Sequence, residues 1–322
     1  MTPTPVSLVA SPPVATSGVV AAEPRSDDAL LDDLAAVLRR LGSVVVAFSG
    51  GADSAFLARV ALDTLGPAAA AVTAVSPSLA PEERADCRAL AAEWGLDWHE
   101  VVTHEMDDAR YRANEGDRCA WCKTALMDAL GPWAVVEGAT VVLGVNVDDL
   151  GDHRPGQHAA AERGAVFPLV EAGLTKADVR RLSRRLGLRT WDKPAAACLA
   201  SRIPYGTPVA LTTLDRVGRA EAALRRLGLP EVRVRHYGDT ARIEVPVDVL
   251  GRVVAERDAV VAGVKAAGYA RVTLDLEGLR SGNLNADLAV VTVAGDQAGE
   301  PAHGDADGDA VAEAGTGDLT PS

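Results

Sequence analysis

A short run of small and polar residues, Ser49-Gly50-Gly51-Ala52-Asp53-Ser54, has the composition of a loop that binds phosphate. The two glycines lack the side chains that would keep a phosphate from the backbone, and the two serine hydroxyls add donors. Free N–H groups at the start of a following helix attract anions. No lysine follows the second glycine, which excludes the Gly-x-x-x-x-Gly-Lys-Ser/Thr loop. The sequence therefore predicts an anion site formed by Ser49, Gly50, Gly51, Asp53 and Ser54.

Cysteines are the second group of residues that could do chemistry, because a thiolate is both a strong nucleophile and a metal ligand. The chain has four, two of them in the pair Cys119-x-x-Cys122. This number in 322 residues is not a secreted disulfide framework, so we expect a reducing, cytoplasmic compartment. Cys198 lies in an irregular stretch at 190–208, and such stretches are often functional. Cys87 follows an amphipathic helical pattern and is predicted to be a buried structural residue.

The elements that would position these residues alternate between strand and helix. A strand is predicted at 44–48, directly before the phosphate loop, and a helix directly after it. Other strands are predicted at 69–75, 96–102 and 140–145, and other helices at 27–41 and 81–93. This alternation predicts an α/β fold, a parallel sheet with helices on both faces. The polar loop at 146–156 then lies at the carboxyl ends of the strands, where ligands gather in such folds.

A second, smaller unit follows the irregular stretch. Its predicted order is α-β-β-α-β: a helix at 213–227, strands at 231–237 and 241–245, a helix at 247–267 and a strand at 271–276. We therefore expect four regions: a disordered extension at 1–26, a nucleotide-binding domain at 27–206, an α+β substrate or oligomerisation domain at 207–284, and an acidic disordered tail at 285–322.

Much of the formal net charge of −13 comes from that tail, since residues 287–322 contain eight acids and no Lys or Arg. The remainder carries about −5 and is still mildly acidic, which argues against a general nucleic-acid-binding surface. No apolar run approaches the length of a membrane span, so we expect no membrane insertion.

Several segments in combination resemble one enzyme family. They are the phosphate loop, Arg118-Cys119-x-x-Cys122-Lys123, Asn146-x-Asp148-Asp149, and the run from Trp191 to Gly206 that contains Cys198-Leu199-Ala200-Ser201-Arg202. The loop alone is similar to that of PP-loop ATPases in general. The combination resembles LarE, the PP-loop sulfur transferases that help to build the nickel-pincer nucleotide cofactor of lactate racemase and its relatives. The resemblance covers roughly residues 28–280.

What the resemblance implies is a two-stage, ATP-dependent reaction, with ATP in the phosphate loop. ATP adenylates a carboxylate of pyridinium-3,5-dicarboxylate mononucleotide with release of pyrophosphate, and a sulfur nucleophile then displaces AMP and leaves a thiocarboxylate. Both carboxylates are treated in turn. The chemistry is reasonable because a carboxylate is a poor acyl donor until its oxygen leaves as AMP. Mg²⁺ usually accompanies ATP, and the candidate ligands are Asp53, Asp148, Asp149 and Asp152.

The resemblance also implies that Cys198 supplies the sulfur, with Ser201 as a second catalytic residue. Family members with a lone cysteine here give up its own sulfur. Members with three cysteines are thought to hold a 4Fe-4S cluster, here through Cys119, Cys122 and Cys198, with a removable sulfide on the fourth iron. Open alternatives are a zinc site completed by His104 or His153, a redox disulfide between the paired cysteines, and Cys198 acting alone.

A mononucleotide substrate needs a phosphate site, and arginines are the candidates. Arg233 and Arg235 alternate on one strand and project to the same face, where two guanidinium groups could clamp a phosphate. Arg202, four residues after Cys198, would bring a third guanidinium near the sulfur. Glu221 and Glu244 match family positions for acids near the site and are tentative metal ligands, although either could instead pair with the arginines.

Two other functions share this fold. A tRNA thiolase needs a broad basic surface, which the acidic composition does not favour. An ATP-dependent amide synthase needs no trio of cysteines. The resemblance further implies a homo-oligomer, a hexamer in relatives, and other enzymes of nickel-pincer nucleotide synthesis as partners.

Overall fold

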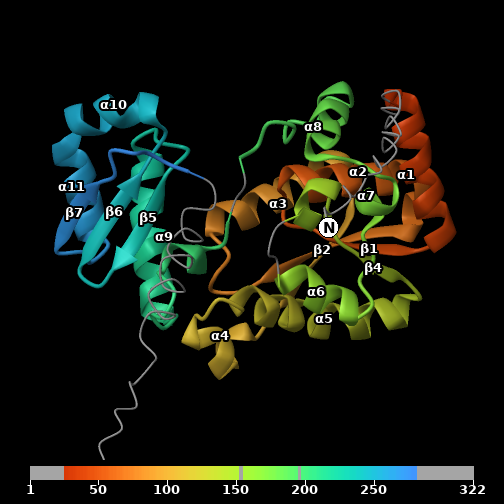
Figure 1. Ribbon diagram of the computed structural model, residues 1–322, viewed down its shortest axis with the longest axis horizontal. Coiled ribbons are helices and arrows are strands. Elements are labelled where there is room, and N and C mark those ends of the chain that lie inside the picture. The colour runs from red at the N-terminus through yellow and green to blue at the C-terminus, as the bar shows by residue number, and fades with distance from the viewer. Residues whose placement is uncertain (1–24, 152–154, 195–196, 281–322) are drawn as a thin grey trace, which may run out of the picture. The chain divides into compact units, whose positions relative to one another are not determined.

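The computed structural model describes residues 25–151, 155–194 and 197–280 (Figure 1). Every element below belongs to one compact unit, which ends at Leu279. Most of the predicted extension at 1–26 and all of the predicted tail at 285–322 lie outside the described residues. The boundary predicted between residues 206 and 207 stays a prediction.

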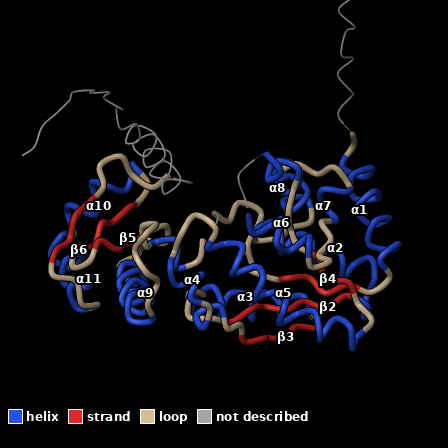
Figure 2. The backbone as a smooth tube through the Cα atoms, turned by 60° about the horizontal axis from the view of Figure 1, so that its bottom comes forward, coloured by secondary structure: helices blue, strands red, loops and turns tan. Residues whose placement is uncertain are grey.

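The first sheet has four strands in the order β3-β2-β1-β4, and every pair is parallel. The strands are β1 Val44–Ala47, β2 Ala69–Val75, β3 Asp97–Val102 and β4 Thr140–Val142. In Figure 2 they run beside one another in red. Val44 of β1 is in register with Ala69 on one side and Thr140 on the other, so β1 and its phosphate loop are central. The predicted α/β class is confirmed.

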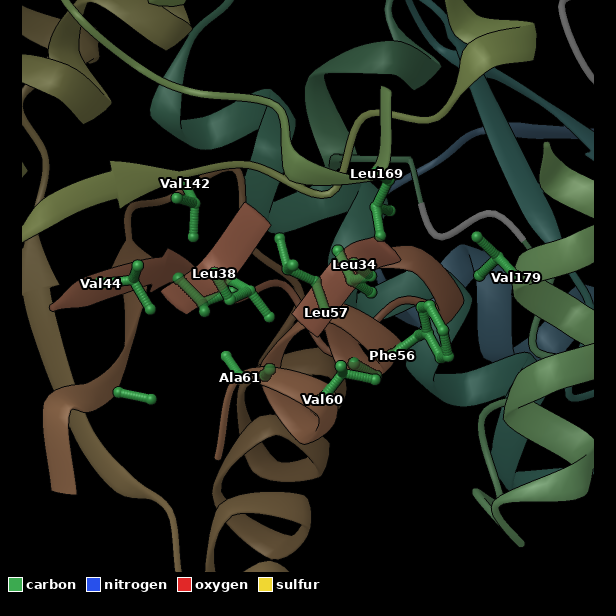
Figure 3. Packing of buried hydrophobic residues seen from close by; sticks show 14 of the residues in the cluster. Leu34, Leu38, Val44, Phe56, Leu57, Val60, Ala61, Val142, Leu169 and Val179 are labelled. Carbon is green, nitrogen blue, oxygen red and sulfur yellow. The ribbon is translucent and has the colours of Figure 1, made fainter. Parts of the chain in front are cut away.

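Both faces of this sheet are covered, as the pattern along β1 requires. Val44 and Val46 point into one core, with Leu38 of α1 and Leu57 of α2 (Figure 3). Val45 points into the core on the other face, with residues of α5 and α6. Side chains of a strand alternate between the faces, so a continuous apolar strand is one buried on both.

The helices of this part begin and end at recognisable signals. Ser26 caps α1, with its hydroxyl accepting from the N–H of Ala29, and Gly42 ends the helix, as predicted. The helices are α1 Asp27–Leu41, α2 Ala52–Leu65, α3 Pro81–Trp94, α4 Ala109–Ala113, α5 Arg118–Glu137, α6 Pro155–Glu162, α7 Pro168–Glu171 and α8 Lys176–Arg185. Short 3-10 helices lie at Gly66–Ala68, Glu105–Asp107 and Val147–Gly151. None of the described helices is long and apolar enough to cross a membrane.

The second sheet is small, with the order β5-β6-β7, and it carries its own apolar core. Its strands are β5 Arg233–Tyr237, β6 Thr240–Glu244 and β7 Arg271–Leu274, and its helices are α9 Leu211–Arg226, α10 Leu250–Ala255 and α11 Arg257–Ala266. The β5–β6 pair is antiparallel and the β6–β7 pair is parallel. The single helix predicted at 247–267 is wrong, because the helix is interrupted at Glu256, whose ψ of 18° is not helical.

Candidate functional site

The phosphate loop joins the end of β1 to the start of α2, as predicted. Gly50 has a φ of 68°, a left-handed conformation that favours glycine, and a Cβ there would lie 2.9 Å from the Sγ of Cys87. Gly51 is the N-cap residue of α2 and offers no side-chain cap. The first N–H groups of α2 are therefore left to a ligand or solvent, which is the arrangement of an anion site.

Two serines close the loop on itself. The hydroxyl of Ser54 accepts a hydrogen bond from the N–H of Ser49 at 3.2 Å and lies 3.1 Å from the Ser49 hydroxyl. Ser54 is buried and Ser49 is exposed, so Ser54 fixes the loop while Ser49 faces outward. Beyond β4, Gly144 allows a close approach: a Cβ there would lie 2.8 Å from the N atom of Ser54.

The side chain of Asp53 contacts the polar loop after β4. The phosphate loop and the polar loop thus lie together at the carboxyl edge of the sheet, as predicted. The amide of Asn146 donates to Asp53 at 3.2 Å, and the Lys176 ammonium forms an ion pair with the same carboxylate. The carboxylate of Asp148 accepts from the N–H of Lys176 at 2.7 Å, and that of Asp149 accepts from the N–H of Asn146 at 3.1 Å. Of the predicted magnesium ligands, Asp152 lies outside the described residues.

Lys193 links the phosphate loop to the segment that leads to Cys198, and sequence analysis gave it no role. Its ammonium donates to the Gly50 carbonyl at 3.1 Å, to Glu83 at 2.8 Å and to Asp86 at 2.6 Å. Burial lowers the pKa of Lys193, but the two carboxylates outweigh this effect and the net pKa is raised. The lysine therefore stays charged and fixes the carbonyl of the first glycine.

The paired cysteines lie in the first two turns of α5, and Cys198 lies at the start of the 3-10 helix η4, Leu199–Arg202. All are free thiols; Cys119 and Cys198 are exposed and Cys122 is half-buried. Burial, together with the smaller effects of the charges of Cys198, Glu105 and Cys119, raises the pKa of Cys122 to about 12 against the opposing effect of Lys123. The three thiols are thus within electrostatic reach of one another.

As a ligand set, these thiols fit an iron–sulfur cluster in donor type. No group of three His, Cys, Asp or Glu side chains among the described residues is gathered as a site for a single metal ion. In a 4Fe-4S cluster each cysteine binds a different iron, so the cysteine sulfurs do not have to converge on one metal position. A zinc site completed by His153 lies outside the described residues, whereas His104 is described and is paired with Asp107 at 3.6 Å.

Buried groups hold the backbone around Cys198. The N–H of Leu199 donates to the carbonyl of Ser78 at 2.8 Å, and the guanidinium of Arg118 donates to the carbonyl of Ala200 at 2.8 Å. Burial opposes the charge of Arg118, but Cys198 and Cys119 more than offset it, so its pKa is raised. Arg118 is thus a buried cation placed near two thiols. In the sequence, Arg118 was only part of a motif, and its position beside the Cys198 segment follows from the fold.

Glu105 is a buried acid that sequence analysis did not find. It is 3% exposed, and its Oε2 atom has no hydrogen-bond partner among the described residues. Its charge raises the pKa of Cys122, which places it near the paired cysteines. A carboxylate oxygen left unpaired in a buried position is costly, and such groups are often found at functional sites.

Ser201 and Arg202 hold the carbonyl of Cys198. The Ser201 hydroxyl donates to that carbonyl at 2.7 Å, and Nη1 of Arg202 donates to it at 3.3 Å and to Ser201 at 2.9 Å. Arg202 also forms a two-pronged ion pair with Glu221, with distances of 2.7 and 3.2 Å. Ser201 is therefore a positioning residue for Cys198 in this structure.

The predicted arginines lie near one another. Of the two roles considered for Glu221 and Glu244, ion pairing with these arginines is the one observed. Arg235 donates to Glu244 at 2.8 Å and to the Ser201 carbonyl at 2.7 Å, and both Glu221 and Glu244 are fully buried. Burial lowers the pKa of Arg233, and the neighbouring Arg202 and Arg235 lower it further. Three guanidinium groups that repel one another favour a bound anion. Metal binding by the two glutamates stays a prediction.

No family model matches the chain. It is 47% identical over 258 residues to an uncharacterised protein of Synechocystis, across 79% of this chain and 96% of the relative. It is 38% identical over 263 residues to the pyridinium-3,5-bisthiocarboxylic acid mononucleotide synthase of Lactiplantibacillus plantarum, across 81% of this chain and 95% of that enzyme. An uncharacterised protein of Methanocaldococcus jannaschii is 28% identical over 169 residues, across 52% of this chain and 66% of the relative. Since the match to the synthase extends over nearly its whole length, the chain belongs to the LarE family.

Proposed function

We propose that this chain is an ATP-dependent sulfur transferase that converts the carboxylates of pyridinium-3,5-dicarboxylate mononucleotide into thiocarboxylates. The observation that carries the proposal is the link between two features. A phosphate loop with an uncapped helix start is connected, through Lys193, to a segment that presents the exposed thiol of Cys198. The printed name of the L. plantarum relative supports the substrate class.

In the first stage, the phosphate loop would bind ATP, and Asp53 with the acids of the polar loop would bind Mg²⁺. A carboxylate oxygen of the substrate attacks the α-phosphorus, the bond to the α–β bridging oxygen breaks, and pyrophosphate leaves. The N–H groups at the start of α2 offset the negative charge on the phosphates. The product is an acyl adenylate, in which AMP is a far better leaving group than oxide.

In the second stage, the sulfur of Cys198 attacks the carbonyl carbon of the adenylate and AMP leaves. The Cβ–S bond of Cys198 then breaks with loss of its α-proton, so that the sulfur stays on the product and dehydroalanine stays in the chain. Arg118 would lie near the reacting sulfur as a buried cation. If a 4Fe-4S cluster is held by Cys119, Cys122 and Cys198, an exchangeable sulfide on its open iron would supply the sulfur instead.

The substrate phosphate would bind at Arg202, Arg233 and Arg235. The supporting observation is the lowered pKa of Arg233, caused by burial and by the other two guanidinium groups. Because Arg202 and Arg235 each have a buried glutamate partner, the net charge of the cluster is smaller than three. A phosphate bound among the three guanidinium groups would offset their mutual repulsion.

The test uses protein purified without oxygen, with ATP, Mg²⁺ and the pyridinium dicarboxylate, and follows pyrophosphate and thiocarboxylate. The wild type should form both, and Cys198→Ala should release pyrophosphate without forming thiocarboxylate. Iron and acid-labile sulfide content separates the sulfur sources: about four irons per chain indicates the cluster, and no iron after reconstitution indicates sacrifice of Cys198. Full turnover by Cys198→Ala would favour an amide synthase, and release of neither product would refute the proposal.

A further inference from the structure

The phosphate loop has one charged side chain, Asp53, and a lysine from a distant part of the chain is bound to it. The ammonium of Lys176 forms an ion pair with one oxygen of Asp53, while the amide of Asn146 donates to the other at 3.2 Å. The Lys176 and Asp53 side chains are 35% and 22% exposed. The loop therefore has a cation beside its carboxylate without having a lysine in its own sequence.

The backbone of Lys176 is fixed, whereas its side chain is free to reorient. Lys176 is the first residue of α8, and its N–H donates to Asp148 at 2.7 Å. The preceding Thr175 forms a capping box with Asp178, which fixes the start of the helix. Asp53 is the one partner recorded for the ammonium within the described ranges. A four-carbon stem on a fixed Cα can move its charge by several ångströms.

The charge balance favours such a movement when a polyphosphate binds. A partly exposed Lys–Asp pair contributes little net stability, so little is lost when the lysine changes its partner. A polyphosphate carries several negative charges, and each hydrogen bond from an ammonium to its oxygens is charge-assisted. Asp53 would repel the same polyphosphate unless a cation neutralised it, and Mg²⁺ can take over that task.

Lys193 does not have this freedom. It is only 19% exposed, and its three donors already have three acceptors, the Gly50 carbonyl and the carboxylates of Glu83 and Asp86. It holds the loop in shape, whereas the Lys176 ammonium has Asp53 as its one recorded partner in the described part of the chain.

We propose that Lys176 is the phosphate-binding lysine of this loop, supplied from α8. In the free protein it neutralises Asp53. When a nucleotide polyphosphate binds, the ammonium moves onto phosphate oxygens beyond the α-phosphate, and Asp53 becomes available to Mg²⁺. The assignment rests on the proposed function in that it takes the loop to bind ATP, and it predicts that Lys176 also binds the departing pyrophosphate.

The experiment measures binding of inorganic pyrophosphate to the full chain by calorimetry, without Mg²⁺. Lys176→Met should weaken binding about tenfold or more, since one charge-assisted interaction is lost. Asp53→Asn should strengthen it, because the lysine no longer has a competing partner. The double variant should still bind more weakly than the wild type, because removing the Asp53 charge relieves its repulsion but does not replace the lysine as a phosphate ligand. Lys265→Met, an exposed lysine of α11, is the matched control and should bind as the wild type does.

The outcomes separate this assignment from the proposed function. If the wild type binds neither pyrophosphate nor Mg·ATP, both fail. If the wild type binds and Lys176→Met binds equally well, only the Lys176 assignment fails. Recovery of wild-type affinity in the double variant would also overturn it, because the lysine would then act only by neutralising Asp53. Should Lys176→Met fold poorly, the Asp53→Asn gain and retained binding in Lys176→Arg decide the question.

Discussion

The ammonium of Lys193 lies 3.1 Å from the carbonyl oxygen of Gly50, so a residue five positions before Cys198 is fastened to the phosphate loop. Because a trans peptide unit is planar, its C=O and N–H point in opposite directions. A lysine that holds the carbonyl of Gly50 thereby directs the N–H of Gly51 to the other side. The lysine fixes the orientation of a donor that it does not touch.

Replacement of Lys193 should damage both stability and nucleotide binding. Lys193→Met leaves Glu83 and Asp86 with one fewer cation and the Gly50 carbonyl without its donor. We expect a loss of about 2 kcal/mol in the free energy of unfolding, measured with urea, and weaker ATP binding. Lys265→Met should change neither quantity. An unchanged ATP affinity in Lys193→Met would contradict the orienting role.

Gly50 and Gly51 should respond differently to alanine. Gly50→Ala places a side chain on a backbone with a φ of 68° and 2.9 Å from the Cys87 sulfur, so a loss of about 2 kcal/mol in stability is expected. Gly51 has a φ of −77°, and its Cβ would meet nothing closer than 3.5 Å, so Gly51→Ala should remain within about 0.5 kcal/mol of the wild type. Equal stability of the two variants in thermal or urea unfolding would refute this assignment.

The arginine cluster offers a second contrast. Arg235→Met removes the buried partner of the fully buried Glu244, which keeps its second, more exposed partner Arg242 at 3.2 Å, and we expect a loss of about 3 kcal/mol in stability. Arg233→Met removes a guanidinium that repels Arg202 and Arg235, so it should cost less stability while weakening binding of the mononucleotide about tenfold. Urea unfolding and substrate titration test both statements. A larger stability loss in Arg233→Met than in Arg235→Met would reverse the assignment.

His236 should make the protein sensitive to acid. Burial lowers the pKa of His236 below the ordinary value of a histidine, and the positive charge of Arg216 lowers it further. A lowered pKa in the folded state means that the unfolded state binds the proton first. The stability that the neutral imidazole contributes is therefore complete above the unfolded pKa and is lost as the pH falls from there through the lower folded pKa. The difference in urea midpoint between pH 7.5 and 5.5 should be smaller in His236→Gln, and unchanged in the exposed control His158→Gln.

Local sequence signals were sufficient to predict most of the helices and strands. Ser26 and Gly42 predicted both ends of α1, and the apolar run before the phosphate loop predicted the central strand of a parallel sheet. No helix was predicted at α5, where Gly131 and Pro132 interrupt the pattern and where the paired cysteines lie. The interruption at Glu256 was also missed, since the helical periodicity continues on both sides of it.

The site was predicted in its motifs but not in its long-range contacts. Lys176 is 123 positions from Asp53, and Lys193 is 143 positions from Gly50. Neither contact produces a periodic pattern in the sequence, because both arise when α8 and an irregular segment pack against the phosphate loop. The partners of Glu221 and Glu244 were left open for the same reason: charge type alone does not distinguish an ion pair from a metal ligand.

The backbone on either side of the Cys198 side chain is held without any help from its sulfur. Its carbonyl accepts from Ser201 and Arg202, and the following N–H is bound by Ser78. None of these described hydrogen bonds would be broken if the sulfur left, or was exchanged, or if the side chain became unsaturated. The turn that presents residue 198 therefore keeps these hydrogen bonds whether or not the sulfur is present.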